Sequence, residues 1–571
     1  MSRNDDVADR LEEMADRLEA QDVEFKPRAY RRAAERIREL DRPIEDVAST
    51  GTEALEALED IGTAIAEKIV EYLESGEIAE LEELKADLPV DMAGLTRVEG
   101  LGPKRVGVLY RALAITDLDE LEAAAKAGAI QEVSGFGAKS EANILERIPF
   151  ARQAAKRHLL VHGVEVAESV IDTLHGSEAV ESCSVAGSIR RWLPTVGDVD
   201  LLVATTDPGA VLDRIQSSDA IEALLEAGER KARARSVSGV NVDFRFIDPS
   251  QFGAALQYFT GSKDHNVLVR RRAIDRGLKI NEYGVFRGEE RIAGETEADV
   301  YATVDLPLFE PEIRQGRGEI EAADAGSLPT LVDHPDIRGD LHVHTRWSDG
   351  VASIEEMATA AADRGYAYLA ITDHAPGSGV RADITVSVDD LRRQRDDVVA
   401  AAESVDIELL HGIEANIEPD GSIDLPDDLL AELDLVVASP HAALTQDGAT
   451  ATERLITAIE HPYVDIIGHP TGRKLGQRPG LDLDLAAVAE AAAAADVALE
   501  VNSHPVRLDL EGSAVRRVIE AGGVVAVSTD AHRVDELRLV RFGVHTARRG
   551  WAEATDVINT WSLDRLVEWL G

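Results

Sequence analysis

The sequence has 571 residues, with 107 acidic against 60 basic side chains and a formal net charge of −47. A chain of this length exceeds what one hydrophobic core can organise, so several domains are expected. The one cysteine, Cys183, excludes an intrachain disulfide and indicates a reducing compartment. The first residues are charged from Arg3 onward, unlike a signal peptide, and the longest apolar stretch, 485–501, is interrupted by two acidic residues. We therefore expect a cytoplasmic protein that makes no contact with a membrane.

The acidic excess is typical of halophilic proteins, in which carboxylates keep the surface hydrated at high salt. The alternative, an acidic chain that avoids nucleic acid, has to be judged from local basic clusters. Such clusters occur at Arg31–Arg32, Lys104–Arg105, Arg190–Arg191, 230–235 and 270–272. Because salt weakens phosphate binding steeply, amide, arginine and metal contacts at short range are expected to carry much of any affinity for DNA.

The N-terminal part has a helical pattern in which three short hairpins recur, at residues 58–62, 98–102 and 133–137. Glycines and lysines mark them: Gly62, Gly100, Gly102, Lys104, Gly135, Gly137 and Lys139. A Gly-x-Gly turn before a helix exposes backbone N–H groups at the positive end of the helix dipole, where a phosphate binds. One such turn is more often an ordinary turn, but the repetition predicts helix-hairpin-helix DNA binding. In the first copy Asp60 replaces a glycine, so that hairpin is expected to bind DNA poorly unless a cation bridges the two anions.

Carboxylates in the middle of the chain have the spacing of a metal site. In a strand, Asp198 and Asp200 point to one face while Val199 points to the core. Residues 240–246 alternate strictly and put Asp243 on a polar face. Three carboxylates on adjacent strands can hold two Mg²⁺ ions, and the preceding Gly187, Ser188 and Arg191 could hold a triphosphate. The alternative is an edge strand with solvated aspartates.

Seven short apolar runs in the C-terminal part each lead to His, Asp or Glu. They are 340–344, 368–374, 413–414, 436–441, 466–469, 499–502 and 524–532. Continuous apolar runs are typical of strands buried on both faces, and stretches rich in Ala, Leu and Glu lie between them. This alternation predicts a parallel β/α barrel with its chemistry at the carboxyl ends of the strands. Imidazoles and carboxylates gathered at one rim predict a metallohydrolase.

Taken together, these motifs resemble known families. The pattern Gly187-Ser188, Gly197-Asp198-Val199-Asp200 and Asp243, followed by residues 258–262, resembles the family X DNA polymerases over residues 1–315. The C-terminal half is similar to the polymerase-and-histidinol-phosphatase (PHP) domain of bacterial and archaeal members. The resemblance implies a multidomain fold with α-helical helix-hairpin-helix N-terminal domains, an α/β nucleotidyltransferase palm and thumb, and a C-terminal distorted (β/α)7 PHP barrel. The implied bounds are 1–90 and 91–147 for the helical domains, 148–249 for the palm, 250–315 for the thumb, 316–336 for a linker and 337–571 for the PHP domain.

The resemblance also assigns roles in the polymerase half. Asp198 and Asp200 would bind both Mg²⁺ ions and Asp243 only the catalytic one. The incoming dNTP would be held by Gly187, Ser188, Arg191, Arg147, Tyr258, Phe259, Gly261 and Asn266, and Arg270 would reach the template strand. Lys26 and Tyr30 match positions that hold the 5′-phosphate of a gap. Lys68 falls on the lysine that removes deoxyribose phosphate in some members, although a solvated helix lysine is the more ordinary interpretation.

In the PHP half the implied set of nine ligands is complete, for up to three Mn²⁺ or Zn²⁺ ions. His342, His344, Glu414 and Asp530 would hold one ion, and Glu414 would bridge to a second held by His441 and His469. Asp349, His374 and His532 would hold the third. Asp373 and His411 are expected behind the ligands, and His461, His504 and His545 at the surface or behind the ligands.

These expectations define a gap-filling DNA polymerase of base excision repair joined to a metal-dependent 3′–5′ exonuclease. The same barrel site could cleave at abasic sites or remove 3′-phosphates. The alternatives are a barrel that hydrolyses a small phosphate ester or is only structural, and a DNA-binding scaffold with inactive sites. The expected partners are gapped or primed DNA and dNTPs, and the expected state is a monomer.

Overall fold

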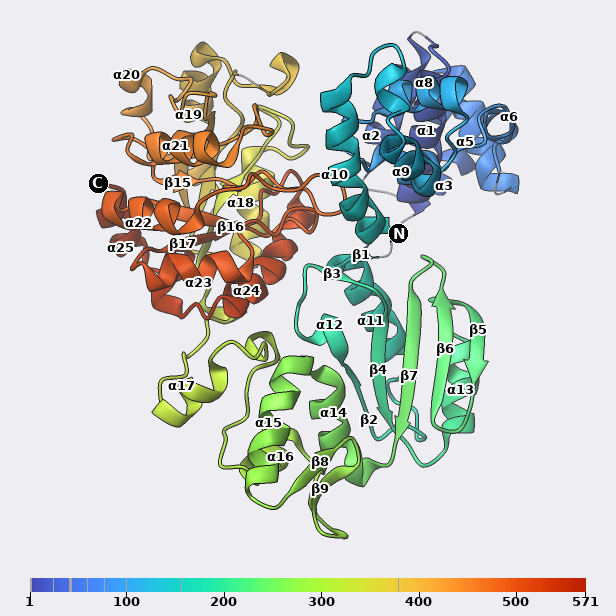
Figure 1. The fold of residues 1–571 in the computed structure, drawn as a ribbon. Coiled ribbons are helices and arrows are strands. Elements are labelled where there is room, and N and C mark those ends of the chain that lie inside the picture. Colours follow the sequence, from blue (N-terminus) through green and yellow to red (C-terminus); the bar gives the residue numbers. More distant parts are fainter. Residues whose placement is uncertain are drawn as a thin grey trace. The chain divides into compact units, whose positions relative to one another are not determined.

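The computed structural model describes residues 3–571 except 24, 39, 41–43, 59, 76, 99, 156 and 378. The chain forms two compact units, residues 1–157 with 476–478, and residues 158–475 with 479–571 (Figure 1). Within the described ranges, no helix is long and apolar enough to cross a membrane.

The first unit is helical, and amphipathic helices build its core. Val7, Leu11, Met14 and Leu18 form one buried stripe on the first helix, which packs against α2 and α8. Its helices are α1 (Arg3–Ala20), α2 (Lys26–Arg38), α3 (Ile44–Ser49), α4 (Thr52–Glu56), α5 (Thr63–Ser75), α6 (Ala79–Asp87), α7 (Met92–Thr96), α8 (Pro103–Leu113), α9 (Leu118–Lys126), η1 (Ile130–Glu132) and α10 (Ala138–Ala155).

The three predicted hairpins share one backbone conformation. Gly100 and Gly135 have positive φ, 81° and 88°, and the next helix begins shortly after each of them. Asp60 adopts the same left-handed conformation, with φ 62°, at the equivalent place before α5. The first copy therefore keeps the turn at the cost of an unfavourable backbone conformation. Its carboxylate lies 3.3 Å from Arg32. Glu59 and Glu99 of the hairpins are outside the described residues.

The second unit begins with the predicted palm, a five-stranded sheet in the order β2-β4-β7-β6-β5. Strands β4 and β7 are parallel, and the other pairs are antiparallel. Apolar residues of α11 and α13 pack against one face of the sheet, where Val199 and Leu201 of β4 point into the same core. The elements are β1 (His158–Leu159), α11 (Leu160–Leu174), β2 (Ser182–Val185), α12 (Gly187–Arg190), β3 (Thr195–Val196), β4 (Val199–Ala204), α13 (Pro208–Gln216), β5 (Ile221–Ala227), β6 (Lys231–Ser236) and β7 (Asn241–Ile247).

The predicted thumb follows and is held to the palm by buried charges. Glu297 accepts two hydrogen bonds from Arg190, of 2.8 and 2.6 Å, and one of 2.6 Å from the buried Arg314. Removing one partner of such a network leaves a charge buried without compensation. The elements are α14 (Phe252–Thr260), α15 (Lys263–Asp275), β8 (Lys279–Asn281), β9 (Gly284–Arg287), β10 (Glu290–Ala293) and α16 (Glu297–Ala302).

Residues 316–336, predicted as a linker, are folded and tethered at both ends. They contain α17 (Glu319–Ala325), and the buried carboxylate of Glu319 lies 2.8 Å from His265 Nδ1 of the thumb. Further along, the amide of Val332 donates to the carbonyl of Ala552. Composition suggested a linker because of the glycines and Arg317 here, but the buried hydrogen bond between Glu319 and His265 is a long-range contact that composition does not reveal.

The barrel has seven parallel strands in sequential order, and a bridge between Val343 and Ala531 brings the first and last strands together, so it is nearly closed. The predicted fold class is therefore confirmed. Its strands are β11 (Gly339–Val343), β12 (Tyr368–Ile371), β13 (Glu408–Asn416), β14 (Leu435–Ser439), β15 (Ile466–Ile467), β16 (Ala498–Asn502) and β17 (Val525–Ser528). Its helices are α18 (Ile354–Asp363), α19 (Val388–Ala402), α20 (Asp427–Leu430), α21 (Gly448–Ile459), α22 (Leu485–Ala495), α23 (Gly512–Glu520), α24 (Val540–Arg549) and α25 (Leu563–Leu570).

Palm and barrel share a hydrophobic core within the second unit, because Leu508, Leu539 and Phe542 pack with residues of the palm. His545 was predicted at the surface or behind the metal ligands, but it belongs to this junction. Its ring stacks on Trp192 at 3.6 Å, and its Nδ1 lies 2.6 Å from Glu312.

Candidate active sites

The palm brings its three predicted aspartates together. Asp200 on β4 pairs directly with Asp243 on β7 in parallel register, and Asp198 precedes Asp200 by two residues. Burial alternates along β7 as predicted, so Asp243 shares the less buried face with Asn241 and Arg245. This face carries a dense group of carboxylates.

The electrostatics of this group favour a bound cation. Burial raises the pKa of Asp200 to about 6, and the neighbouring Asp198 and Asp243 add to the shift. Gly187 at the start of α12 has φ 59°, and a Cβ there would lie 2.2 Å from Asp200 Oδ2. Only glycine lets this backbone approach the carboxylate so closely. Crowded carboxylates with a raised pKa fit a divalent cation pair.

Asp243 has a partner that the sequence did not suggest. Arg233 on β6 donates to both of its carboxylate oxygens, at 2.5 and 2.6 Å. The guanidinium thus occupies one side of the place where a cation would bind. The register of the consecutive antiparallel strands β6 and β7 puts Arg233 opposite Asp243.

The residues predicted to bind the nucleotide lie around α12 and α14. Arg191 donates to the carbonyl of Thr260, just before Gly261. Tyr258 and Phe259 make an edge-to-face pair, and Arg245 lies 4.3 Å above the ring of Phe259. The side-chain amide of Asn266 is engaged by Gln257 and by the carbonyl of Tyr258. Arg270 follows on α15, with its Nε 3.2 Å from the carbonyl of Asn266. Arg147 lies on α10 in the first unit, so its role stays a prediction.

Lys26, Tyr30 and Lys68 converge in the first unit around Glu80, a residue that the sequence analysis missed. Lys68 Nζ lies 2.8 Å and Lys26 Nζ 3.7 Å from the carboxylate of Glu80. Burial by itself lowers the pKa of Lys68, but the hydrogen bond to Glu80 and the nearby Tyr30 raise it above its ordinary value. A lysine that forms a Schiff base must be neutral, so Glu80 opposes that role in this state of the protein. Among the hairpin lysines, Lys104 pairs with Asp22 at 2.7 Å, and Lys139 is exposed.

The nine predicted barrel ligands converge at the carboxyl ends of the strands. Glu414 lies at their centre, with its carboxylate 2.7 Å from His374 Nδ1, 3.2 Å from His441 Nε2 and 3.1 Å from His469 Nε2. Three clusters have the spacing of metal sites: His342, His344 and Asp530; His374, Glu414 and His441; and His344, Asp349, His374 and His532. His344 and His374 are shared between clusters, whereas the sequence analysis placed each with one ion.

The donor set fits metal ions. Several buried ring nitrogens and one carboxylate oxygen make no hydrogen bond of good geometry, although some of them lie at ion-pair distance from one another: His342 Nε2, both nitrogens of His344, His374 Nδ1, His441 Nε2, His469 Nδ1 and Glu414 Oε2. Unpaired buried polar atoms are rare in folded proteins. Burial lowers the pKa of His344 to about 4 and that of His469 to about 3, so both are neutral, which is the form that binds a metal.

A second group of side chains orients the ligands. Glu500 on β16 accepts from His342 Nδ1 at 2.7 Å and from the amide of His469 at 2.6 Å. Asn416 binds His441 Nδ1 at 2.7 Å, and Asn502 donates to Asp530. Glu500 and Asn502 end the sixth apolar run, so the strand-end signal could have identified them. Such partners fix the tautomer and direction of a ligand.

Asp373 and His411 stand further back than expected. Asp373 accepts from the amide and hydroxyl of Thr345, at 2.7 Å each, and from Gln394. Gln394 in turn lies 3.2 Å from His411 Nε2. Asp373 therefore holds the loop after β11 in place, and among the described residues no hydrogen bond joins the side chain of Asp373 or His411 to a ligand side chain. His461 lies 3.4 Å from Asp427, and burial lowers the pKa of His504 to about 4.

Comparison with known proteins agrees with this architecture. Residues 2–78 match the helix-hairpin-helix domain family, residues 92–148 the SAM-like helix-hairpin-helix tandem, residues 255–315 the DNA polymerase beta thumb and residues 340–504 the PHP domain. Fold and sites thus define a nucleotidyltransferase with DNA-binding hairpins, fused to a PHP metallohydrolase barrel.

The chain is 36% identical to the DNA polymerase/3′-5′ exonuclease PolX of Bacillus subtilis over 98% of its own length and 97% of that protein. It is 25% identical to DNA polymerase lambda of Rattus norvegicus over 54% of its length and 56% of that protein. A probable phosphatase of Shewanella sediminis is 35% identical over 34% of this chain and 77% of its own length. The chain belongs to the family X DNA polymerases that carry a PHP domain.

Proposed function

We propose that the chain is a DNA-directed DNA polymerase that fills short gaps in DNA, and that its barrel is a metal-dependent 3′–5′ exonuclease. The observation that carries the polymerase activity is the direct pairing of Asp200 with Asp243 beside Asp198. Mg²⁺ bound there would supply the charge that activates a primer hydroxyl and stabilises a leaving pyrophosphate. Gly187, Ser188 and Arg191 bind the triphosphate in this proposal, and Tyr258, Phe259, Gly261 and Asn266 orient the nucleotide.

The exonuclease proposal rests on Glu414 and the imidazoles around it. Up to three Mn²⁺ or Zn²⁺ ions would supply Lewis-acid activation of water for attack on a phosphodiester. Glu500, Asn416 and Asn502 keep the ligand side chains in the required orientation. Fusion to DNA-binding hairpins makes a DNA end the natural substrate.

Phosphatase activity is the second candidate for the barrel. It is favoured by the similarity to the probable phosphatase of S. sediminis over much of that protein's length. A 3′-phosphate on DNA would satisfy both candidates, since it presents a monoester at the end that the exonuclease would attack. Cleavage at abasic sites is a further reaction of the same centre.

The remaining parts of the proposal concern the cell. We place the protein as a monomer in the cytoplasm of a salt-accumulating organism, acting in base excision repair on gapped DNA. The net charge of −47 supports an origin in a cell with high internal salt. The hairpin residues Gly62, Gly100, Gly102, Lys104, Gly135, Gly137 and Lys139 bind the DNA backbone in this proposal, with Lys26 and Tyr30 at the 5′-phosphate and Arg270 at the template.

One assay separates the two activities. The chain is incubated with a gapped duplex and with a 3′-mismatched primer, with and without dNTPs. Asp198→Ala should abolish extension and leave degradation, whereas His344→Ala should do the reverse. Loss of both activities in either variant would contradict two separate sites.

A further inference from the structure

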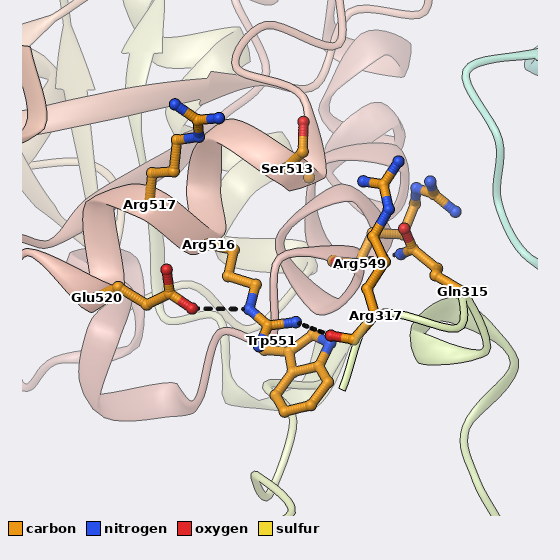
Figure 2. A pocket seen from close by; sticks show the side chains of 9 residues that line it. Gln315, Arg317, Ser513, Arg516, Arg517, Glu520, Arg549 and Trp551 are labelled. Atoms are coloured by element: carbon orange, nitrogen blue, oxygen red, sulfur yellow. Dashed lines mark hydrogen bonds and ion pairs between the residues drawn. The ribbon is translucent and has the colours of Figure 1, made fainter. Parts of the chain in front are cut away.

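An arginine-rich cavity lies between the segment after the thumb and the barrel helices α23 and α24 (Figure 2). Its volume is about 260 Å³, and its walls carry Arg317, Arg516, Arg517 and Arg549. A second cavity of about 150 Å³ shares Arg317 and Arg549 and adds Arg473. Among the described residues that line the two cavities, the carboxylates are those of Glu511 and Glu520.

Three of these arginines form no ion pair with a described carboxylate. Arg516 pairs with Glu520 at 2.9 Å and Arg473 with Glu511 at 3.3 Å. Within the described part of the chain, no carboxylate lies at ion-pair distance from Arg317, Arg517 or Arg549. Acidic residues outnumber basic ones by 107 to 60, so five described arginines that share two cavity walls with two described carboxylates run against the composition of the chain. Guanidinium groups that share one cavity and make no direct ion pair favour an anionic ligand.

Arg516 is held in place by its neighbours in the cavity wall. The guanidinium of Arg516 lies 4.0 Å above the ring of Trp551, and its Nη1 donates to the carbonyl of Arg317 at 2.9 Å. Figure 2 shows this bond beside the hydrogen bond from Arg516 to Glu520. Arg516 therefore fixes the backbone that carries Arg317, while the side chains of Arg317 and Arg517 are exposed.

Direct contacts connect the two cavities to both candidate active sites. On the palm side, Arg549 Nη1 donates to the carbonyl of Arg191 at 2.8 Å. On the barrel side, Arg473 Nε donates to the carbonyl of Arg507 at 2.8 Å. Arg507 Nε in turn lies 3.4 Å from Asp530, one of the predicted metal ligands.

We propose that these cavities bind the backbone phosphates of a single-stranded DNA 3′ segment that extends from the palm toward the PHP centre. This rests on the proposed function, which places a polymerase and a 3′-end nuclease in one chain. Repeating phosphates suit a row of guanidinium groups along two adjoining cavities. Each cavity is smaller than the roughly 300–1000 Å³ of a site for an enclosed small molecule, so a whole nucleotide would not be buried there.

Binding can be measured without catalysis. A fluorescein-labelled oligo-dT strand of about 16 nucleotides is titrated with full-length Arg317→Gln/Arg517→Gln in EDTA, over a salt series in which the chain stays folded. Loss of two phosphate contacts should reduce the slope of log affinity against log salt by about 1.4 and weaken binding about tenfold. The matched control, Arg364→Gln/Arg392→Gln, removes two exposed barrel arginines and should behave as wild type.

A second experiment tests whether the DNA 3′ segment reaches the PHP centre through these cavities. Excision of a 3′-mismatched nucleotide by Arg317→Gln/Arg517→Gln should fall by the same factor as binding. Extension of a matched primer in a one-nucleotide gap, and hydrolysis of bis(p-nitrophenyl) phosphate, should be unchanged. Arg317→Lys/Arg517→Lys should retain the salt slope, because the slope counts charges.

Two outcomes would overturn the proposal: a salt slope equal to that of the control pair, or unchanged oligonucleotide binding with loss of dTTP binding, which would define a site for free nucleotides. If wild type removes no 3′ ends with Mn²⁺ present but the slope still falls in the variant, the proposed exonuclease fails and the strand site stands.

Discussion

Asp200 and Asp243 lie directly opposite each other on parallel strands, and Arg233 from a third strand holds Asp243 at both oxygens. Like charges in facing positions destabilise a sheet unless a cation lies between them. In the palm, the guanidinium of Arg233 supplies this positive charge, and a divalent ion that binds Asp243 has to compete with it.

Asp200→Ala should reduce nucleotide incorporation by about a thousandfold or more, because it removes several kcal/mol of charge stabilisation. Single-nucleotide extension of a gapped duplex measures this loss. Degradation of a single strand serves as the control, since the barrel ligands are untouched. Extension at a tenth of the wild-type rate would contradict the assignment.

Arg233→Gln should lower the Mg²⁺ concentration that half-saturates extension, because the ion no longer displaces a guanidinium from Asp243. The side chain of Arg233 is 45% exposed, so the pair contributes at most about 1 kcal/mol and the shift should be at most about fivefold. Arg235→Gln, on the same strand and also exposed, is the control. A higher Mg²⁺ requirement in Arg233→Gln alone would show that Arg233 supports the site.

Glu500→Gln should weaken metal binding in the barrel about 10- to 100-fold, because His342 loses the carboxylate that orients it. Mn²⁺ titration by calorimetry gives this value independently of turnover. Glu408→Gln, an exposed change on β13, should bind Mn²⁺ as wild type does. Equal affinities in the two variants would remove Glu500 from the site.

Glu312 makes the palm–barrel junction sensitive to acid. Burial by itself would raise its pKa, but His545 and Arg548 hold the pKa at about 2, below the usual 4.5. A lowered pKa stabilises the fold above the unfolded-state value, and this stability is lost as pH falls through the folded-state value. Glu312→Gln should thus destabilise the protein by about 3 kcal/mol at pH 7, and the difference should shrink between pH 4.5 and 2.

Chemical denaturation across that pH range tests the effect. Glu310→Gln is the control, because Glu310 also pairs with Arg548 but is 58% exposed, and it should cost less than about 1 kcal/mol. A Glu312→Gln difference that is constant with pH would mean that packing, not charge, is lost.

Glu80 provides a sharp test of the lyase prediction for Lys68. Glu80→Gln removes the partner that raises the pKa of Lys68, so more neutral amine is present at pH 7 and borohydride trapping on a 5′-deoxyribose phosphate end should increase. Lys68→Ala should abolish trapping. If neither substitution changes the amount of trapped product, another amine forms the Schiff base.

The sequence alone determined the fold class and predicted most of the residues that gather at the two sites. The resemblance to the PHP domain supplied the full set of nine barrel ligands. The apolar runs by themselves predicted the barrel and its rim, and the pleat puts Asp198 and Asp200 on one face. Both signals depend on neighbours in the chain and can be read locally. The helix-hairpin-helix turns were recognisable for the same reason, down to the departure at Asp60.

The tertiary structure alone decided which of these residues meet. Three arrangements join residues far apart in the chain: the position of Glu414 among the histidines, the partnership of Glu500 with His342, and the cavity wall that Arg317 and Arg549 share. Arg233 and Asp243 are close in sequence, but the register that pairs them is set by the folded hairpin. Such contacts follow from strand register and from packing between domains, and their energy depends on three-dimensional proximity that local spacing does not encode.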